Sequence, residues 1–371
     1  KMTDFKLKME LLKITNIIYF SICLITFDFG IASKYKLVGR FASPCFLFTI
    51  YFLFFNKSYE LIKEGNIFEI LFSVITIICY GNILTKVITI SYYGEDMKDL
   101  FKWIENFYFE HSYPILIKIK AKSLRRTLWL LKLFLKFYIT SIIIILIYLN
   151  VYLIVNDIQM IKMPWMSERV NANLQIGLYL SCTLFYGIPA MCFGSMGIIM
   201  IGVLKLFNEC ITLLENNEED TNVDEFILIL HKLHCEIYSK FYIYGNIFSY
   251  SLFFEITLNA GTAIADLIII RLYPFQALFY ISFIVLVSQL LIYCIFGQII
   301  FTETEKISEN LYLTKWYDMN KGNKQILLIM MMMSSRPFGL KAAGMYELNI
   351  VLFVQIMKLI FSYCAIFYAF L

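Results

Sequence analysis

Three ionisable residues, Lys86, Glu255 and Lys358, stand inside long apolar stretches of the sequence. Charge in hydrocarbon is costly, so such residues in membrane helices usually face a partner, the protein interior or a water-filled path. Lys86 falls in the inner half of its stretch, and we favour an interpretation in which its long side chain reaches the lipid headgroups. Lys358 falls near the middle of its stretch, so we expect it to face water or another subunit.

Other patterns that could carry chemistry are weaker. His231 and His234 lie at a helical spacing that metal sites use, but no cysteine or carboxylate completes a ligand set with motif spacing. Four consecutive methionines, Met330 to Met333, point around a helix and cannot converge on one ion. The sequence contains no glycine-rich phosphate loop, nucleophile elbow or zinc-protease motif. We therefore predict a protein that is not an enzyme and has no cofactor or metal.

Aromatic residues make up 18% of the chain. Some belong at membrane–water interfaces and others pack helices together. A further group falls deeper, in the outer halves of the predicted spans, where it could wall an apolar pocket that contains a few hydroxyls. The candidate ligand-binding residues are Phe72, Thr76, Tyr80, Tyr148, Tyr152, Tyr179, Thr183, Tyr186, Tyr280 and Phe283.

The composition indicates a membrane protein. Of the 371 residues, 60% are hydrophobic and 16% are charged, whereas about a quarter of a soluble domain is charged. Apolar runs of about twenty residues recur along the chain without the alternation of a membrane barrel, so helices are expected. The net charge of +4 is small and the basic residues form only short clusters, which argues against a nucleic-acid partner. The nine cysteines form no Cys-x-x-Cys pair and are interpreted as reduced, buried residues.

We predict an all-α membrane protein with seven transmembrane helices, inverted topology and a cytoplasmic helical anchor bundle. The predicted spans are Val38–Phe55, Ile67–Tyr93, Leu128–Val155, Leu174–Leu206, Phe241–Ile270, Ala277–Phe301 and Leu348–Leu371. The chain would then divide into a cytoplasmic amino terminus (1–37), spans one to four (38–206), cytoplasmic extensions (207–240), spans five and six (241–301), an anchor segment (302–347) and span seven (348–371).

Lysine and arginine set the predicted orientation. Most of them fall on the side of the amino terminus, which the positive-inside rule places in the cytoplasm, so the carboxyl terminus lies outside. The sequon at Asn56 falls on the outer side and gives weak support. The apolar run Ile14–Phe27 is too short to cross a core of about 30 Å. It is either a cleaved signal peptide or an interfacial helix, and we favour the interfacial helix because this end is predicted to be inside.

Two inner segments are predicted to pack together. Residues Phe207–Lys240 are typical of a helix that leaves span four, an acidic turn and a helix that leads into span five. Residues Lys324–Ser334 form an apolar stretch that is too short to cross a membrane.

A set of residues near the carboxyl end has the order and spacing of a family signature. It comprises the run Gln289–Gly297, then Glu303, Glu305, Leu311, Tyr312, Trp316, Tyr317, Arg336, Pro337, Leu340, Ala343, Gly344, Ser362 and Tyr363. This set resembles the carboxyl-terminal signature of insect odorant receptors. The rest of the chain matches in the number and length of its spans and in orientation. The co-receptor of that family has a long insertion between spans four and five, whereas this chain has only a short acidic turn there. The chain therefore resembles a ligand-tuned subunit.

The resemblance implies a ligand-gated, non-selective cation channel in which four subunits, including the co-receptor, surround one pore in the plasma membrane of olfactory sensory neurons. The expected partners are the co-receptor, a small volatile molecule, membrane lipid and permeating cations. The seventh helix would line the pore, with its gate at Ile366 beside Ser362 and Tyr363. The cavity would lie among the outer halves of spans two, three, four and six, with Tyr280 as its best candidate. The residues implied in the subunit anchor are Tyr312, Trp316, Tyr317 and Gly344.

Three alternatives remain open. A gustatory-receptor-like channel would share the topology. A transporter should show an internal repeat or broken spans, and neither is seen. A metabotropic receptor should end in a cytoplasmic tail, whereas this chain ends at the apolar Leu371.

Overall fold

The computed structural model describes residues 2–28, 33–64, 67–109, 114–155, 168–215 and 223–370. Within these ranges the chain is almost entirely helical, and one short hairpin precedes the last helix. The elements are α1 (Met2–Thr26), α2 (Ser33–Glu64), α3 (Ile67–Phe109), α4 (Pro114–Val155), α5 (Glu168–Glu215), α6 (Val223–Leu272), α7 (Ala277–Leu313), η1 (Trp316–Asp318), α8 (Lys321–Ser334), β1 (Lys341–Ala342), β2 (Tyr346–Glu347) and α9 (Ile350–Phe370).

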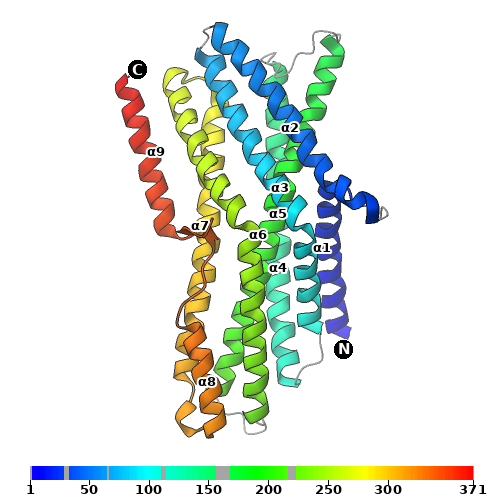
Figure 1. Cartoon of the computed structure of the whole chain (residues 1–371), viewed down its shortest axis with the longest axis vertical. Helices are drawn as coiled ribbons and strands as arrows, with labels where there is room; N and C mark the ends of the chain where they lie inside the picture. The colour runs from blue at the N-terminus through cyan, green and yellow to red at the C-terminus, as the bar shows by residue number, and fades with distance from the viewer. Residues whose placement is uncertain are drawn as a thin grey trace.

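Long helices run side by side along the molecule (Figure 1). Helices α5 and α6 contain 48 and 50 residues, so each is roughly 70–75 Å long, more than twice the thickness of a hydrocarbon core. The 21 residues of α9 are confined to one half of the bundle, and α8 lies at the opposite end (Figure 1). Seven helices in the described part are long and apolar enough to cross a membrane. The predicted all-α membrane class is confirmed.

Helix α1, with 25 residues, is longer than the apolar run Ile14–Phe27 that the sequence marked. Its segment Lys6–Thr26 is among the candidate spans, and the helix runs along the bundle beside α3 and α4 (Figure 1). One face, including Leu11, Ile18 and Ile22, is buried, whereas Lys6 lies on the exposed face. The interfacial position of this helix stays a prediction. The predicted span Val38–Phe55 is helical as part of α2 and stays a prediction.

Helix α8 is fastened to α6 near both of its ends. Asn320 caps α8 by accepting a hydrogen bond from the backbone N–H of Asn323 at 2.8 Å. The side-chain amides of Asn320 and Asn323 donate to Asp224 at 2.8 and 2.6 Å. At the other end, His234 Nε2 lies 2.9 Å from Ser334 Oγ. His234 is thus a packing residue, and among the described residues no three His, Cys, Asp or Glu side chains are grouped to hold a metal ion.

A two-stranded antiparallel hairpin leads into α9. Its turn requires positive φ at Ala343 (49°) and Gly344 (72°), a conformation that glycine adopts without strain. The backbone N–H of Ala343 donates to the carbonyl of Ser249 at 3.0 Å, which ties the hairpin to α6. Gly344 therefore lies in the turn of the hairpin that precedes α9, and its implied role in the subunit anchor stays a prediction.

Candidate ligand site and gate

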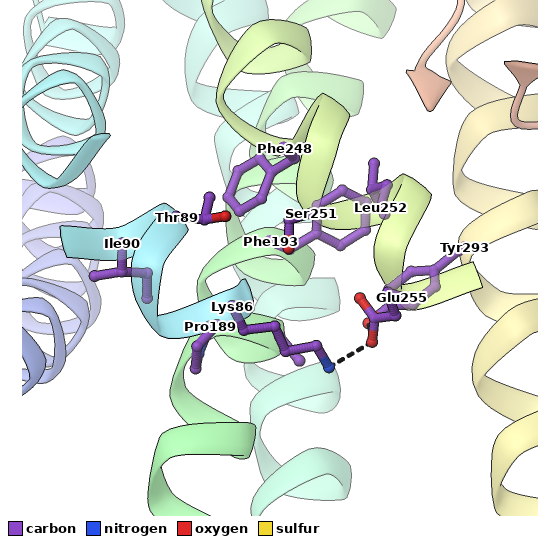
Figure 2. A pocket seen from close by; sticks show the side chains of 11 residues that line it. Lys86, Thr89, Ile90, Pro189, Phe193, Phe248, Ser251, Leu252, Glu255 and Tyr293 are labelled. Carbon is purple, nitrogen blue, oxygen red and sulfur yellow. Dashed lines mark hydrogen bonds and ion pairs between the residues drawn. The ribbon is translucent and has the colours of Figure 1, made fainter. Parts of the chain in front are cut away.

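Lys86 of α3 and Glu255 of α6 form an ion pair in the interior of the bundle (Figure 2). Their side chains are only 1% and 4% exposed. The interpretation that Lys86 reaches the headgroups is wrong, because its position on α3 turns it toward α6 and away from lipid. Two charges so far from water are stable only when further contacts satisfy them.

A layer of polar side chains supplies those contacts. Glu255 Oε1 accepts hydrogen bonds from Gln289 Nε2 at 2.5 Å and from the Tyr293 hydroxyl at 2.8 Å. The Tyr186 hydroxyl donates to Gln289 Oε1 at 2.5 Å, and Lys86 Nζ lies 3.7 Å from the centroid of the Tyr186 ring. These five residues, which we call the Lys86 layer, join α3, α5, α6 and α7.

Sequence reasoning identified part of the Lys86 layer. Lys86 and Glu255 were noted separately as ionisable residues inside apolar stretches, and Tyr186 was a candidate ligand residue. Gln289 and Tyr293 were noted only for the resemblance. Gln289 and Tyr293 are one turn apart on a helix, and Glu255 is a carboxylate inside another span. This combination was the sequence signal from which the layer could have been predicted.

A small cavity adjoins the Lys86 layer between α3, α5 and α6. Its walls include Thr89, Pro189, Phe193, Phe248 and Ser251 (Figure 2). Its free volume is about 10 Å³, which is room for about one water molecule. Pockets for small organic ligands usually measure about 300–1,000 Å³, so this cavity does not admit such a ligand in the present conformation.

Several candidate ligand residues meet between the helices. Tyr80 is buried, and its hydroxyl lies 3.1 Å from Cys182 Sγ of α5. The ring of Phe72 packs edge-to-face against Phe279 of α7, with 6.2 Å between the centroids. Thr76 is also buried and donates to the Phe72 carbonyl of its own helix at 2.8 Å. These contacts link α3 to α5 and α7.

Other candidates lie farther from the interior. Tyr280 is 41% exposed, whereas its neighbour Phe279 is 2% exposed, so the rotation of α7 turns Phe279 and not Tyr280 toward α3. Tyr148, Thr183 and Phe283 are half-buried. The side chains of two further candidates lie outside the described part of the chain, namely Tyr152 and Tyr179.

Helix α9 is attached to the bundle along one side. Ile360 and Cys364 are buried, and the Tyr368 hydroxyl donates to the Leu267 carbonyl of α6 at 2.8 Å. The remaining face is uncovered in the single chain. It carries the three candidate pore residues, Ser362, Tyr363 and Ile366, and also Lys358.

The predicted anchor aromatics form an exposed group near η1. Tyr312 lies in the last turn of α7, and Trp316 and Tyr317 lie in η1. All three side chains are exposed. Clustered exposed aromatic side chains are typical of a protein contact surface.

The signature run also contains a position where backbones meet closely. A Cβ atom built on Gly297 of α7 would overlap the carbonyl oxygen of Leu348, just before α9. Glycine is therefore required for α7 to approach the start of α9. Farther along α7, Asn208 Nδ2 of α5 donates to the Glu303 carbonyl at 3.0 Å.

Comparisons with known proteins agree with this architecture. A model of the family described as 7tm Odorant receptor matches residues 66–361. The chain is similar to the solved structure of the insect olfactory receptor OR5 from Machilis hrabei, with a TM-score of 0.72 at 13% identity over 97% of this chain and 98% of that one. For the complex of OR5 with eugenol the TM-score is 0.75 at 12% identity, with the same coverage. At such low identity these two structures establish the fold.

Proposed function

Since the chain belongs to the 7tm odorant receptor family and is therefore an odorant receptor, we propose that it forms a ligand-gated, non-selective cation channel with a co-receptor subunit. It is a multi-pass membrane protein and not an enzyme. We place it in the plasma membrane of olfactory sensory neurons, with its amino terminus inside. The gustatory-receptor, transporter and metabotropic alternatives have no observation in their favour.

One observation carries the channel proposal, namely the uncovered face of α9. A helix that crosses the membrane with one side packed on its own subunit has its other side available for neighbouring subunits or a pore. In this proposal four α9 helices surround the axis, and the exposed aromatics Tyr312, Trp316 and Tyr317 contact neighbouring subunits. Ile366 narrows the pore and closes it by excluding water.

The proposed ligand is a small volatile molecule held by the outer parts of α3, α4, α5 and α7. The relative's complex with eugenol supports this class of ligand. About a dozen heavy atoms at roughly 0.5 kcal/mol each would give about 6 kcal/mol, or a dissociation constant of about 40 μM. The ligand opens the pore to the extent that it binds the open state more tightly than the closed state.

Expression with and without the co-receptor tests the proposal. We expect cation currents in response to a panel of volatiles when both chains are present, and far smaller currents from either chain alone. Currents from this chain alone that match those of the pair would contradict the heteromeric arrangement. Responses that require a G protein would contradict the channel itself.

Ile366→Ala should favour the open pore. The smaller alanine widens the proposed apolar constriction, so water enters it more readily. We expect the ratio of open to closed channels without ligand to rise about tenfold, equivalent to about 1.4 kcal/mol. Basal current per surface receptor measures this ratio. Val354→Ala is the control, because Val354 lies on an exposed part of α9 nearer the start of the helix. It should leave basal current unchanged. Equal basal currents in the two variants would mean that Ile366 does not form the gate.

A further inference from the structure

Asp266 of α6 is a buried carboxylate that lacks a partner. Its side chain is 0% exposed, and neither carboxyl oxygen has a hydrogen-bond partner among the described residues. The hydroxyl of Ser282 on α7 lies within interaction range, but no hydrogen bond of normal geometry forms. Buried carboxylates are ordinarily paired, because an isolated negative charge inside a protein is costly. The Lys86 layer and the proposed gate do not use this residue.

No cation in the described part of the chain compensates Asp266. Lys86 is already paired with Glu255, which lies about three helical turns, or roughly 16 Å, away along α6. Arg271 is exposed and lies near Tyr368 on the α9 side of α6. Cys79 of α3 lies near enough to interact electrostatically with Asp266, and it brings no positive charge. When Asp266 is ionised, this region therefore has one unbalanced negative charge.

The surroundings of Asp266 suit an organic cation. One turn farther along the helices lies a small apolar cluster of Ile75, Ala265, Ile269 and Phe279, with Phe72 packed against it. Aromatic rings attract an ammonium group electrostatically, and a carboxylate binds it directly. Phe72 was also among the ligand residues predicted from the sequence. The charge and the rings thus lie in the region where the proposed function places the ligand.

We propose that Asp266 is the counter-ion for ligands that carry a protonated amine. The ammonium group would bind between α3, α6 and α7 at Asp266, and the apolar body of the ligand would separate and contact the rings of Phe72 and Phe279. A neutral ligand of the same shape leaves the carboxylate uncompensated, so the site discriminates by charge. This inference rests on the proposed function, since it names the chemical class of the ligand proposed there.

Matched ligands test the proposal in cells that express this chain with the co-receptor. The probes are hexylamine against hexanol, and phenethylamine against phenethyl alcohol, each compared by the concentration that gives half-maximal current. We expect each amine to be at least about tenfold more potent than its alcohol. Asp266→Asn keeps the size of the side chain but removes the charge, so it should weaken amines about tenfold or more and leave the alcohols nearly unchanged. Asp96→Asn, an exposed carboxylate on α3, should change neither.

Thermal unfolding of the purified receptor gives a readout that does not depend on current. Phenethylamine should raise the unfolding temperature of the wild type and of Asp96→Asn, but not that of Asp266→Asn. Stabilisation without current would reject the channel proposal and leave this inference standing. Amines no better than alcohols in both assays, or an Asp266→Asn change that weakens both classes equally, would overturn the inference. The wild type could instead respond better to alcohols and lose that preference in Asp266→Asn. This result would mean that the carboxyl group of Asp266 is protonated and donates to neutral ligands, and it would also overturn the inference.

Discussion

Replacing Lys86 with methionine is expected to lower the free energy of unfolding by about 3–5 kcal/mol, the usual cost of breaking a buried ion pair. Methionine retains the apolar part of the side chain, but Glu255 is then left as a buried charge without its cation. Thermal unfolding of the purified receptor, together with the fraction of protein at the cell surface, measures the loss. The double variant Lys86→Met with Glu255→Gln should recover most of the stability, because glutamine is neutral and can still accept from Gln289 and Tyr293.

An exposed ion pair on the same molecule provides the matched control. Lys132 Nζ lies 2.8 Å from a carboxylate oxygen of Glu10, and both side chains are substantially exposed. Exposed pairs contribute at most about 1 kcal/mol, so Lys132→Met should have a small effect. If Lys86→Met proved as mild as Lys132→Met, or if the double variant were no more stable than the single one, the Lys86 layer would not depend on a charged pair.

Gly297→Ala is expected to disturb the channel more than any other single-methyl change in α7. The added methyl group would meet the backbone carbonyl of Leu348, which cannot rotate aside as a flexible side chain can. Either α7 or the segment that leads into α9 must move, and such overpacking typically costs about 1–3 kcal/mol. Because α9 is the proposed pore helix, we expect ligand-evoked current per surface receptor to fall about tenfold, equivalent to about 1.4 kcal/mol in the gating equilibrium.

Gly261→Ala is the control that separates this steric effect from the general effect of replacing glycine with alanine in a helix. A Cβ atom at Gly261 of α6 has no neighbour within 4 Å. Gly261→Ala should therefore leave current unchanged and could stabilise α6 by about 0.5–1 kcal/mol. Normal gating in Gly297→Ala would mean that the close approach of α7 to Leu348 does not position α9.

The residues of the carboxyl-terminal signature show why part of the site could be predicted. Gln289 and Tyr293 satisfy Glu255, and Gly297 admits the backbone before α9. Gln289, Tyr293 and Gly297 lie at fixed spacing on the single helix α7, so their contacts require a pattern that is visible in the sequence. The resemblance therefore indicated the family, although it did not reveal what each residue contacts.

By itself, the sequence determined the class of the molecule. Long apolar runs must form helices in lipid, because the backbone has no water to satisfy its hydrogen bonds there. Helices α3 to α7 accordingly contain their predicted spans, and α9 (Ile350–Phe370) lies within the predicted span Leu348–Leu371. The apolar stretch Lys324–Ser334 is too short to cross a membrane and was predicted as a separate inner segment. It lies within the short helix α8.

Only the tertiary structure decided how the helices are rotated and which side chains meet. A helix that is apolar on all sides has no polar face to mark its outward direction, since lipid is as apolar as the protein interior. For this reason the sequence did not show that Phe279 is the buried neighbour of Tyr280, and it directed Lys86 toward the headgroups. The pairing of Lys86 with Glu255, and the isolation of Asp266, arise from contacts between α3, α6 and α7. Those contacts depend on the packing of whole helices, which no local pattern of residues specifies.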